Sequence, residues 1–371
     1  MRALIFIQRY QAGGAERHAA YLANYLYHRK NIEVYVLAFG GKGDISRAWF
    51  KIPSDKLINL GFKEKNILYG GFRPDLLVKK ARDIQRLKKQ LKLLKPDVII
   101  PFTYEPNIIA GNLWKIIGAK KCIWNQQDEG RYFEGKKFEQ KALQNCSHWV
   151  TNSEAGRQFL EKYGVSNIQL IHNGIEIPAE QKLQVDDGVF RAVMLANLHV
   201  FKDHMTLLNG WNIFVSKYPQ KKFELILAGK DGNATQDIRS FIIENNLADT
   251  VTLAGQVSNI FELLKRCSIA VFSSSTEGLP NAVLECMAIG LPVIGSRIPG
   301  MVEALGEDCP YLFEPKNYVE LANMLEDAYL KRNELKIIGI QNQKRIEQYF
   351  SLEKMGSKYL DLLTDTEITT T

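Results

Sequence analysis

Short apolar runs alternate with longer amphipathic stretches along most of this chain. Runs of about four to eight apolar residues between polar segments predict buried strands. The stretches between them repeat apolar residues at helical spacing, as at about 75–95, where an apolar stripe marks one side. Strands that alternate with helices predict an α/β protein with parallel sheets. The predicted strands are 3–7, 32–37, 57–60, 97–101, 121–125, 190–198, 223–229, 251–255, 269–272 and 311–313.

The alternation stops once, in a polar stretch at 180–188, and then starts again. A chain of 371 residues is long for one domain and comfortable for two, each with a sizeable core. We therefore predict a first domain at 1–177 and a second at 178–349, followed by a last helix at about 350–364.

The composition is that of a soluble globular protein, with 46% apolar and 24% charged residues. The five cysteines are odd in number and widely spaced, which favours reduced thiols over a disulfide framework or a zinc site. No apolar run reaches the roughly 18 residues that a membrane-spanning helix needs, and the opening apolar run is too short for a signal peptide. These features favour a cytoplasmic protein.

A Ser/Thr/Gly-rich loop at 273–279 follows a predicted strand. Pro280 suits the first turn of the predicted helix that follows, and helix formers continue it through 281–289. A parallel sheet places such a loop at its ligand-binding carboxyl edge, and a helix start attracts phosphate. Glu277 and Glu285 flank this anion site, and carboxylates accept hydrogen bonds from sugar hydroxyls. The pattern indicates a sugar nucleotide, with its phosphates on backbone N–H groups and one glutamate for each sugar ring. Glu277 could instead be a loop residue favoured by the helix dipole, and Glu285 a solvated residue of the helix.

These residues resemble the signature of the retaining nucleotide-sugar glycosyltransferases of family four, which have the GT-B fold. The resemblance rests on Glu277-Gly278-Leu279-Pro280-Asn281, Glu285, Gly290-Leu291-Pro292-Val293-Ile294, Gly300 and Glu303. It implies two Rossmann-like domains with parallel sheets that face a central cleft. It also implies that the second domain binds the donor and that the helix at about 350–364 packs back on the first.

The resemblance implies transfer of a sugar from a UDP- or GDP-linked donor to a hydroxyl of a glycan or lipid-linked acceptor, in surface polysaccharide or glycoconjugate biosynthesis. The acceptor would attack from the leaving-group face, so that configuration is retained. The departing diphosphate would take the acceptor proton. Glu277 and Lys202 would be catalytic, since Lys202 and the helix start near Asn281 stabilise charge on the diphosphate. No Asp-x-Asp motif occurs, so we expect neither a metal nor a cofactor besides the donor.

Further donor contacts follow from the same resemblance. Asn197 occupies the place of the family's usual arginine, so Lys202 should carry more of the phosphate contact, although it could also be a surface lysine. The paired glycines after the first strand should face the donor phosphates and the acceptor, unless they only form a turn. The expected donor site comprises Gly13, Gly14, Asn197, Lys202, Gly229, Val257, Glu277, Gly278, Leu279, Pro280, Asn281, Ala282 and Glu285.

The acceptor side is expected after the strand at 121–125. The family commonly has a histidine there, but this chain has Gln126 and Gln127. A glutamine can hydrogen-bond a sugar hydroxyl but cannot shuttle a proton, so we place no general base here. Asp128 and Arg131 are further acceptor candidates, with a plain polar loop as the alternative.

The helix at about 75–95 carries eight lysines and arginines on its basic face. Their summed charge is larger than the formal net charge of the whole protein, +7. The face could simply be solvated, or it could rest on anionic lipid, where each basic residue contributes about 1 kcal/mol. Nucleic acid is not expected, because no aromatic residues or binding motifs accompany the charge. We therefore expect a peripheral protein at the inner face of a membrane. The cations are Lys79, Lys80, Arg82, Arg86, Lys88, Lys89, Lys92 and Lys95.

Two other classes of function fit the same pattern. One is a different enzyme on the same fold, such as a sugar-nucleotide epimerase or a phosphorylase. The other is a non-catalytic protein that binds a nucleotide sugar, which the missing histidine and arginine would suit.

Overall fold

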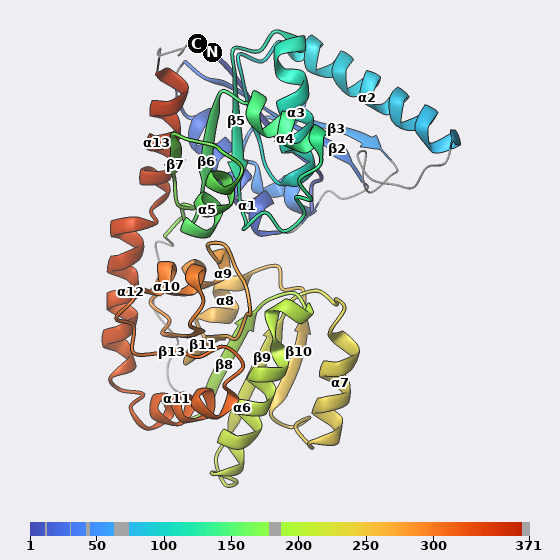
Figure 1. Ribbon diagram of the computed structural model, residues 1–371. Coiled ribbons are helices and arrows are strands. Elements are labelled where there is room, and N and C mark those ends of the chain that lie inside the picture. Colours follow the sequence, from blue (N-terminus) through green and yellow to red (C-terminus); the bar gives the residue numbers. More distant parts are fainter. Residues whose placement is uncertain (12, 30, 42–44, 63–73, 178–186, 366–371) are drawn as a thin grey trace. The chain divides into compact units, whose positions relative to one another are not determined.

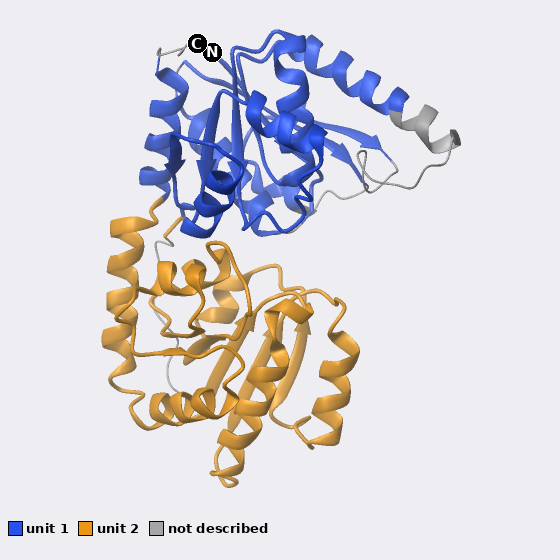
Figure 2. Cartoon of the chain, in the orientation of Figure 1, with its two compact units in different colours: residues 1–174, 352–371 blue, residues 175–351 orange. Residues whose placement is uncertain are grey.

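The computed structural model describes residues 1–11, 13–29, 31–41, 45–62, 74–177 and 187–365 (Figure 1). The chain forms two compact units, Met1–Gly174 with Leu352–Thr371, and Ile175–Ser351 (Figure 2). The first division lies three residues before the one expected at 177, and the second lies two residues after the one expected at 349. Most of the expected linker at 180–188 lies outside the described residues.

Unit 1 is built on seven parallel strands in the order β3-β2-β1-β4-β5-β6-β7. The inner strands are apolar on both faces because helices cover both sides of the sheet. The strands are β1 (Arg2–Ile7), β2 (Glu33–Gly40), β3 (Leu57–Phe62), β4 (Val98–Pro101), β5 (Lys121–Gln126), β6 (His148–Thr151) and β7 (Ile168–Leu170).

Successive residues of β1 enter two different cores. Ala3 and Ile5 pack toward α1 (Gly14–Tyr27) and α13 (Leu352–Thr364). Leu4 and Phe6 pack on the other face, toward the remaining helices of this unit. Those helices are α2 (Pro74–Leu94), α3 (Tyr104–Ile117), α4 (Lys137–Asn145) and α5 (Glu154–Lys162), and the 3-10 turns η1 (Ile45–Trp49) and η2 (Ser54–Lys56) follow β2.

The last helix of the chain, α13, is fixed onto unit 1 by specific contacts. The Tyr25 hydroxyl donates a hydrogen bond of 2.8 Å to Glu353 Oε1. Lys121 Nζ donates to the Leu362 carbonyl near the end of α13, at 2.9 Å. A Cβ atom at Gly356 would lie 2.3 Å from the Tyr25 ring, so α13 can approach α1 closely only because residue 356 is glycine.

Unit 2 contains six parallel strands in the order β10-β9-β8-β11-β12-β13. Helix α6 packs against α11, and α9 packs against α10 and α12. The strands are β8 (Phe190–Leu195), β9 (Phe223–Ala228), β10 (Val251–Gly255), β11 (Ile269–Phe272), β12 (Val293–Ser296) and β13 (Leu312–Phe313). The helices are η3 (Val200–Lys202), α6 (His204–Ser216), α7 (Thr235–Glu244), α8 (Ile260–Leu264), α9 (Asn281–Ala288), α10 (Pro299–Leu305), α11 (Tyr318–Leu330) and α12 (Leu335–Tyr349).

Both sheets reverse their strand order at the first strand of the unit, β1 or β8. Open α/β sheets bind ligands outside the carboxyl ends of the strands at this switch point. In unit 2 the switch point lies between β8 and β11, and in unit 1 between β1 and β4. The α/β prediction with parallel sheets is therefore confirmed.

Two local predictions were wrong. Strand β8 ends at Leu195 rather than at residue 198, because the chain leaves the sheet there to form η3. Pro280 does not lie in the first turn of α9 but caps it in an extended conformation, with φ −79° and ψ 103°. No helix in the described ranges is both long and apolar enough to cross a membrane.

Candidate functional site

The loop after β11 is tied to the segment after β8 by serine hydroxyls and backbone groups. Ser273 Oγ donates to the Asp203 carbonyl at 2.8 Å, and the Ser275 N–H donates to the Phe201 carbonyl at 2.8 Å. Ser296 Oγ, at the end of β12, donates to the Ser274 carbonyl at 2.6 Å. The serine hydroxyls of the loop take part in these long-range hydrogen bonds, which gives the serines of the loop a structural role. They hold the two loops of the switch point together.

Lys202 and Glu277, the two expected catalytic residues, form an ion pair between these loops. Lys202 Nζ contacts Glu277 Oε1, and Ser274 Oγ donates to the same oxygen at 2.8 Å. The two side chains are only 21% and 12% exposed, so water screens their charges less than at an open surface. An ammonium has three N–H donors, so Lys202 keeps donors for a phosphate while it contacts Glu277.

The start of α9 offers backbone N–H groups beside this pair. The Pro280 carbonyl accepts the N–H groups of Val283 and Leu284, at 3.0 and 3.3 Å. The half-buried Ala282 N–H has no acceptor among the residues that the structure describes. Such an amide at the positive end of a helix suits a phosphate oxygen. Gly278, Leu279 and Pro280, which precede it, are buried.

Gly300 explains why a distant glycine accompanies the loop signature. A Cβ atom at Gly300 would lie 1.6 Å from the Gly278 carbonyl oxygen and 2.8 Å from the Glu277 oxygen. The first turn of α10 therefore packs directly on the backbone that presents Glu277. Glu285, one turn further into α9, is 5% exposed.

The ends of β8 and β9 lie in close contact through Asn197 and Gly229. Asn197 Oδ1 accepts the Lys230 N–H at 2.9 Å, and its amide hydrogens have no acceptor among the described residues, so they could meet a ligand. A Cβ at Gly229 would lie 2.0 Å from the Ala196 carbonyl oxygen, so the glycine is required by the neighbouring backbone. Val257 is half-buried in the loop after β10, at the same edge of the sheet.

His204, the first residue of α6, is buried next to Lys202 and was missed by the sequence analysis. Its burial, together with the nearby Lys202 ammonium, lowers the pKa of His204 to about 4. The ring is therefore neutral near pH 7 and adds no positive charge beside Lys202. Only its place at a helix start two residues after Lys202 could have drawn attention to it.

Gly13 and Gly14 lie in unit 1, whereas all the other expected donor residues lie in unit 2. Gly13 is extended before α1, with φ −159° and ψ 164°. A Cβ there would lie 2.4 Å from Glu16 Oε2, so the glycine makes room for the Glu16 side chain. The Gly-Gly turn thus has a structural explanation in unit 1, and its donor contact stays a prediction.

The two acceptor-side glutamines differ in what their side chains contact. Gln126 accepts from Trp124 Nε1 at 2.9 Å and donates to the carbonyl and the carboxylate of Asp128, both at 2.9 Å. Gln127 is half-buried and contacts His18 and Asn152. The Gln126 amide is therefore used within the protein, and Gln127 is the better candidate for a ligand contact.

Asp128 and Arg131 are also engaged locally. Asp128 Oδ1 accepts the Gly130 N–H at 2.8 Å, which closes a turn, and burial raises the pKa of the Asp128 carboxyl. Arg131 Nη2 lies 3.0 Å from Glu129 Oε1. These contacts shape the loop, so any contact of the two side chains with an acceptor remains a prediction.

Thr103, two residues after the end of β4, was also missed, and it lies at the switch point of unit 1. Its φ of 72° and ψ of 172° fall in a region that is almost restricted to glycine. Such strain costs about 1–3 kcal/mol and is concentrated at functional sites. A sequence pattern carries no signal for it, since threonine is common in ordinary extended backbone.

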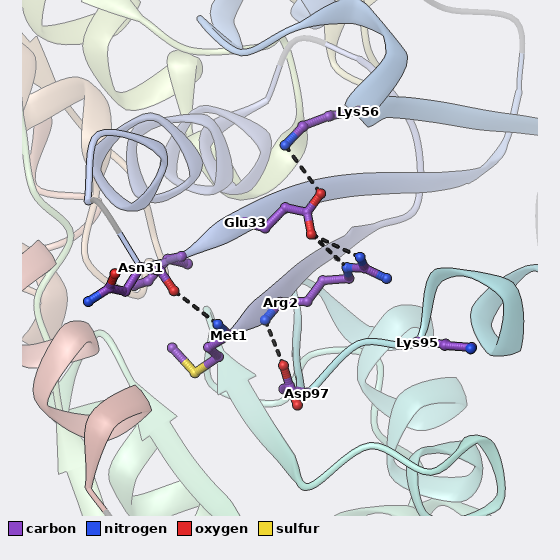
Figure 3. Close-up of a pocket in the computed structure, with 8 residues that line it drawn as sticks. Met1, Arg2, Asn31, Glu33, Lys56, Lys95 and Asp97 are labelled. Atoms are coloured by element: carbon purple, nitrogen blue, oxygen red, sulfur yellow. Dashed lines mark hydrogen bonds and ion pairs between the residues drawn. The ribbon is translucent and has the colours of Figure 1, made fainter.

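A cavity of about 600 Å³ lies at the opposite edge of the unit 1 sheet, near the amino ends of β1 and β2 (Figure 3). Its charged groups mainly bind one another. Arg2 Nε donates to Glu33 Oε2 at 2.9 Å, and the Arg2 N–H donates to Asp97 Oδ2 at 2.7 Å. The cavity is remote from the carboxyl edge, and we do not assign the site to it.

Comparison with known proteins identifies the family. The model of Glycosyltransferase Family 4 matches residues 12–177, and the model of Glycosyl transferases group 1 matches residues 190–330. An uncharacterized glycosyltransferase of Haemophilus influenzae is 23% identical over 362 residues, covering 95% of this chain and 96% of the relative. The O-antigen biosynthesis glycosyltransferase WclY of Escherichia coli is 23% identical over 291 residues, covering 78% and 76%.

Solved structures show the same fold. Anabaena Alr3699/HepE in complex with UDP and glucose has a TM-score of 0.80 at 17% identity, with 98% of this chain and 99% of that chain covered. Both halves of the sequence match family models, and both units have the parallel sheets that the resemblance implied. The chain therefore belongs to the group 1, family 4 glycosyltransferases and has the GT-B fold.

Proposed function

We propose that this glycosyltransferase moves a sugar from a nucleoside diphosphate sugar to a hydroxyl of a glycan or lipid-linked acceptor, with retention of configuration. The observation that carries the proposal is the pairing of Lys202 and Glu277 at the β8–β11 switch point, beside the start of α9. A cation, a helix start and a carboxylate at one place suit a diphosphate joined to a sugar.

In the proposed reaction the acceptor oxygen forms a bond to the anomeric carbon, and the bond from that carbon to the diphosphate oxygen breaks. The acceptor proton passes to the departing diphosphate, so no protein base is needed. Lys202 and the N–H groups at the start of α9 stabilise the charge that develops on the diphosphate. Because these groups meet the charge, we propose that neither a metal nor a cofactor takes part.

Each donor contact then has a role. Glu277 binds hydroxyls of the transferred sugar, and Glu285 binds the ribose. The loop residues 278–282 surround the phosphates, and Gly13 and Gly14 contribute from unit 1. Asn197, Gly229 and Val257 lie along the carboxyl edge of β8, β9 and β10, where a base would fit. We propose a UDP- or GDP-linked donor, and UDP is the nucleotide bound by the Anabaena neighbour.

The acceptor is proposed to bind unit 1 near Gln127, Asp128 and Arg131. Surface polysaccharide is favoured as its class because one relative acts in O-antigen biosynthesis. The reaction would then supply glycan chains with single sugars.

The outer face of α2 is proposed to rest on an anionic membrane. Arg82, Arg86, Lys89 and Lys92 are exposed at spacings of three or four residues, so they form one stripe. Leu93, beside this stripe, is 64% exposed. The side chains of Lys79 and Lys80 lie outside the described residues.

A thermal-shift screen with UDP-, GDP- and ADP-hexoses tests the donor proposal. A ligand at a hundred times its Kd adds about 2.7 kcal/mol to the free energy of unfolding. We expect one nucleotide class to raise the Tm, and Glu285→Ala to reduce this rise. If no sugar nucleotide raises the Tm and none binds in calorimetry, the proposal is wrong.

One observation favours a second candidate, a binding protein without turnover. Asn197 replaces a charged residue, and its Oδ1 is already bound to Lys230. Such a protein would bind the nucleotide sugar and leave it intact for hours, whereas the proposed enzyme would release the nucleoside diphosphate.

A further inference from the structure

Buried polar side chains form a continuous chain at the carboxyl edge of the unit 1 sheet. Asn125 Nδ2, on β5, donates to the Tyr359 hydroxyl of α13 at 2.9 Å. Gln127 Nε2 donates in turn to Asn125 Oδ1. Gln127 Oε1 accepts from His18 Nδ1 of α1 at 3.0 Å and from Asn152 Nδ2 at 3.3 Å. Apart from the half-buried Gln127, every residue of this hydrogen-bond network is at most 2% exposed.

These hydrogen bonds fix the orientation of the Gln127 carboxamide. Its oxygen already accepts two hydrogen bonds, which is its full capacity. Its nitrogen donates one, to Asn125, and the second N–H has no acceptor among the described residues. Gln127 can therefore offer a ligand a hydrogen-bond donor and not an acceptor.

The His18 ring is neutral and held on several sides. Burial lowers the pKa of His18 to about 4. In this network Gln127 Oε1 accepts, so the tautomer that satisfies the contact carries its single ring proton on Nδ1. Asn173 is a further hydrogen-bond partner of the ring. The other nitrogen, Nε2, lies 2.8 Å from Met355 Sδ on α13, and Phe102 meets the ring edge-on at a centroid distance of 5.3 Å.

Met355 connects this hydrogen-bond network to the segment where the polypeptide leaves unit 1. The Gly174 N–H, at the last residue before unit 2, donates to the same sulfur at 3.1 Å. The His18 ring is thus held in place by Met355 of α13, and Met355 is in turn held by the Gly174 N–H. If His18 served only to fill space, its ring nitrogen would not have to face the Gln127 oxygen.

We propose that His18 is a positioning residue for the acceptor, which acts by holding Gln127 so that one Nε2–H points to the oxygen of an acceptor hydroxyl. The inference rests on the proposed function, because it concerns the acceptor of that reaction. His18 touches no reacting atom in this account. Its Nδ1–H selects the orientation of the amide that does contact the acceptor.

Three substitutions separate the hydrogen bond from simple packing. His18→Asn keeps an N–H donor near the place of Nδ1, and His18→Gln keeps one near the place of Nε2. His18→Leu fills much of the volume and keeps neither donor. The control is Tyr25→Phe, which removes a different hydrogen bond between α1 and α13.

The first readout is the side-chain amide signal of Gln127 in protein labelled with ¹⁵N-glutamine, identified by its loss in Gln127→Glu. This readout needs no substrate. We expect the shift of wild type to persist in His18→Asn and Tyr25→Phe. In His18→Leu and His18→Gln it should move toward that of a solvated amide. An unchanged Gln127 signal in a folded His18→Leu protein would overturn the inference.

The second readout is transfer to octyl β-glucoside as an acceptor probe. His18→Leu should raise the KM for the probe about tenfold, the loss of one hydrogen bond, with the donor KM unchanged. His18→Asn should restore the wild-type value. Equal acceptor KM values in wild type and His18→Leu would contradict the inference. If wild type transfers no sugar to this probe, to a panel of other glycoside and lipid-linked acceptors or to water, the proposed function fails, and the amide signal still decides whether His18 orders Gln127.

Discussion

At the scale of residues, the two glutamates of the loop signature lie in different environments. Glu277 contacts the Lys202 ammonium and the Ser274 hydroxyl, so its charge is already compensated before a ligand arrives. Glu285 is nearly buried within α9, near the edge where the nucleotide is proposed to bind. We therefore expect their substitutions to affect different steps.

Glu285→Ala should weaken binding of the nucleoside diphosphate, because a ribose hydroxyl loses its acceptor. The cost of one unpaired buried group is about 1–3 kcal/mol, so Kd should rise by a factor between about 5 and about 150. Titration calorimetry measures this directly, with the exposed Glu262→Ala as control. An unchanged Kd would refute the ribose assignment.

Glu277→Gln should leave the affinity for the nucleoside diphosphate unchanged or higher, since Lys202 loses its competing carboxylate partner. The value of kcat should fall by about a hundredfold, as when an aligned group at the reacting centre is removed. Calorimetry and initial rates together test this division of roles. Loss of nucleotide binding as severe as that in Glu285→Ala would show that the roles are not divided.

Sequence reasoning proposed Lys202, Glu277 and Gln127 as site residues but could not describe their contacts. The Lys202–Glu277 pair joins residues 75 positions apart, and His18 meets Gln127 across 109 positions. Contacts over such distances are set by the order of strands in the sheet. The choice between Gln126 and Gln127 likewise required the structure, since only side-chain direction separates two neighbouring glutamines.

At the scale of elements, most strands and helices lie close to where the hydrophobic pattern put them. The pattern places α2 at about 75–95, and the structure places it at Pro74–Leu94. It failed where backbone geometry rather than burial decides, as at the end of β8 and at Pro280. A proline suits both a helix cap and a first helical turn, because φ near −65° fits either position.

The exposed stripe of α2 should bind anionic vesicles at low salt. Four cations at about 1 kcal/mol each supply about 4 kcal/mol, and the attraction should fade as the Debye length shrinks from about 10 Å at 0.1 M salt to 3 Å at 1 M. Changing Arg82, Arg86, Lys89 and Lys92 to Glu should release the protein in a sedimentation assay and leave donor affinity unchanged.

A control with the same change in net charge alters four exposed lysines of unit 2, Lys221, Lys222, Lys336 and Lys344, to Glu. This variant should still sediment with anionic vesicles. If wild type stays in the supernatant at low salt, or if both variants behave alike, the stripe on α2 is only a solvated face.

At the scale of the whole molecule, the chain repeats one architectural plan in two units. The restart of the strand and helix pattern predicted this division, because each unit buries its own core. The order of strands within each sheet was beyond the hydrophobic pattern and required the structure. Each unit also buries one neutral histidine near its ligand edge, His18 in unit 1 and His204 in unit 2.

Both units should lose stability as the pH falls from 7 to 5. The pKa of each histidine is lowered from its ordinary 6.5 to about 4, so between these values the unfolded chain binds more protons than the folded chain. The free energy of unfolding should therefore fall, by about 2 kcal/mol for each histidine at pH 5.

Urea unfolding at both pH values measures this effect. The raised pKa of Asp128 acts in the opposite sense, at pH values above its ordinary 3.8. Replacing both histidines with Asn should reduce the difference between the two midpoints. Equal midpoints for wild type at pH 7 and pH 5 would show that the rings are not held neutral.

The most direct test of the central claim is ¹H NMR of wild type with its sugar nucleotide, an acceptor panel that includes octyl β-glucoside, and EDTA. The account predicts a new glycoside with the same anomeric configuration as the donor and an equal amount of released nucleoside diphosphate. Lys202→Ala should slow this release by about a hundredfold. An intact donor, an epimerised sugar nucleotide or a glycoside of inverted configuration would contradict the account.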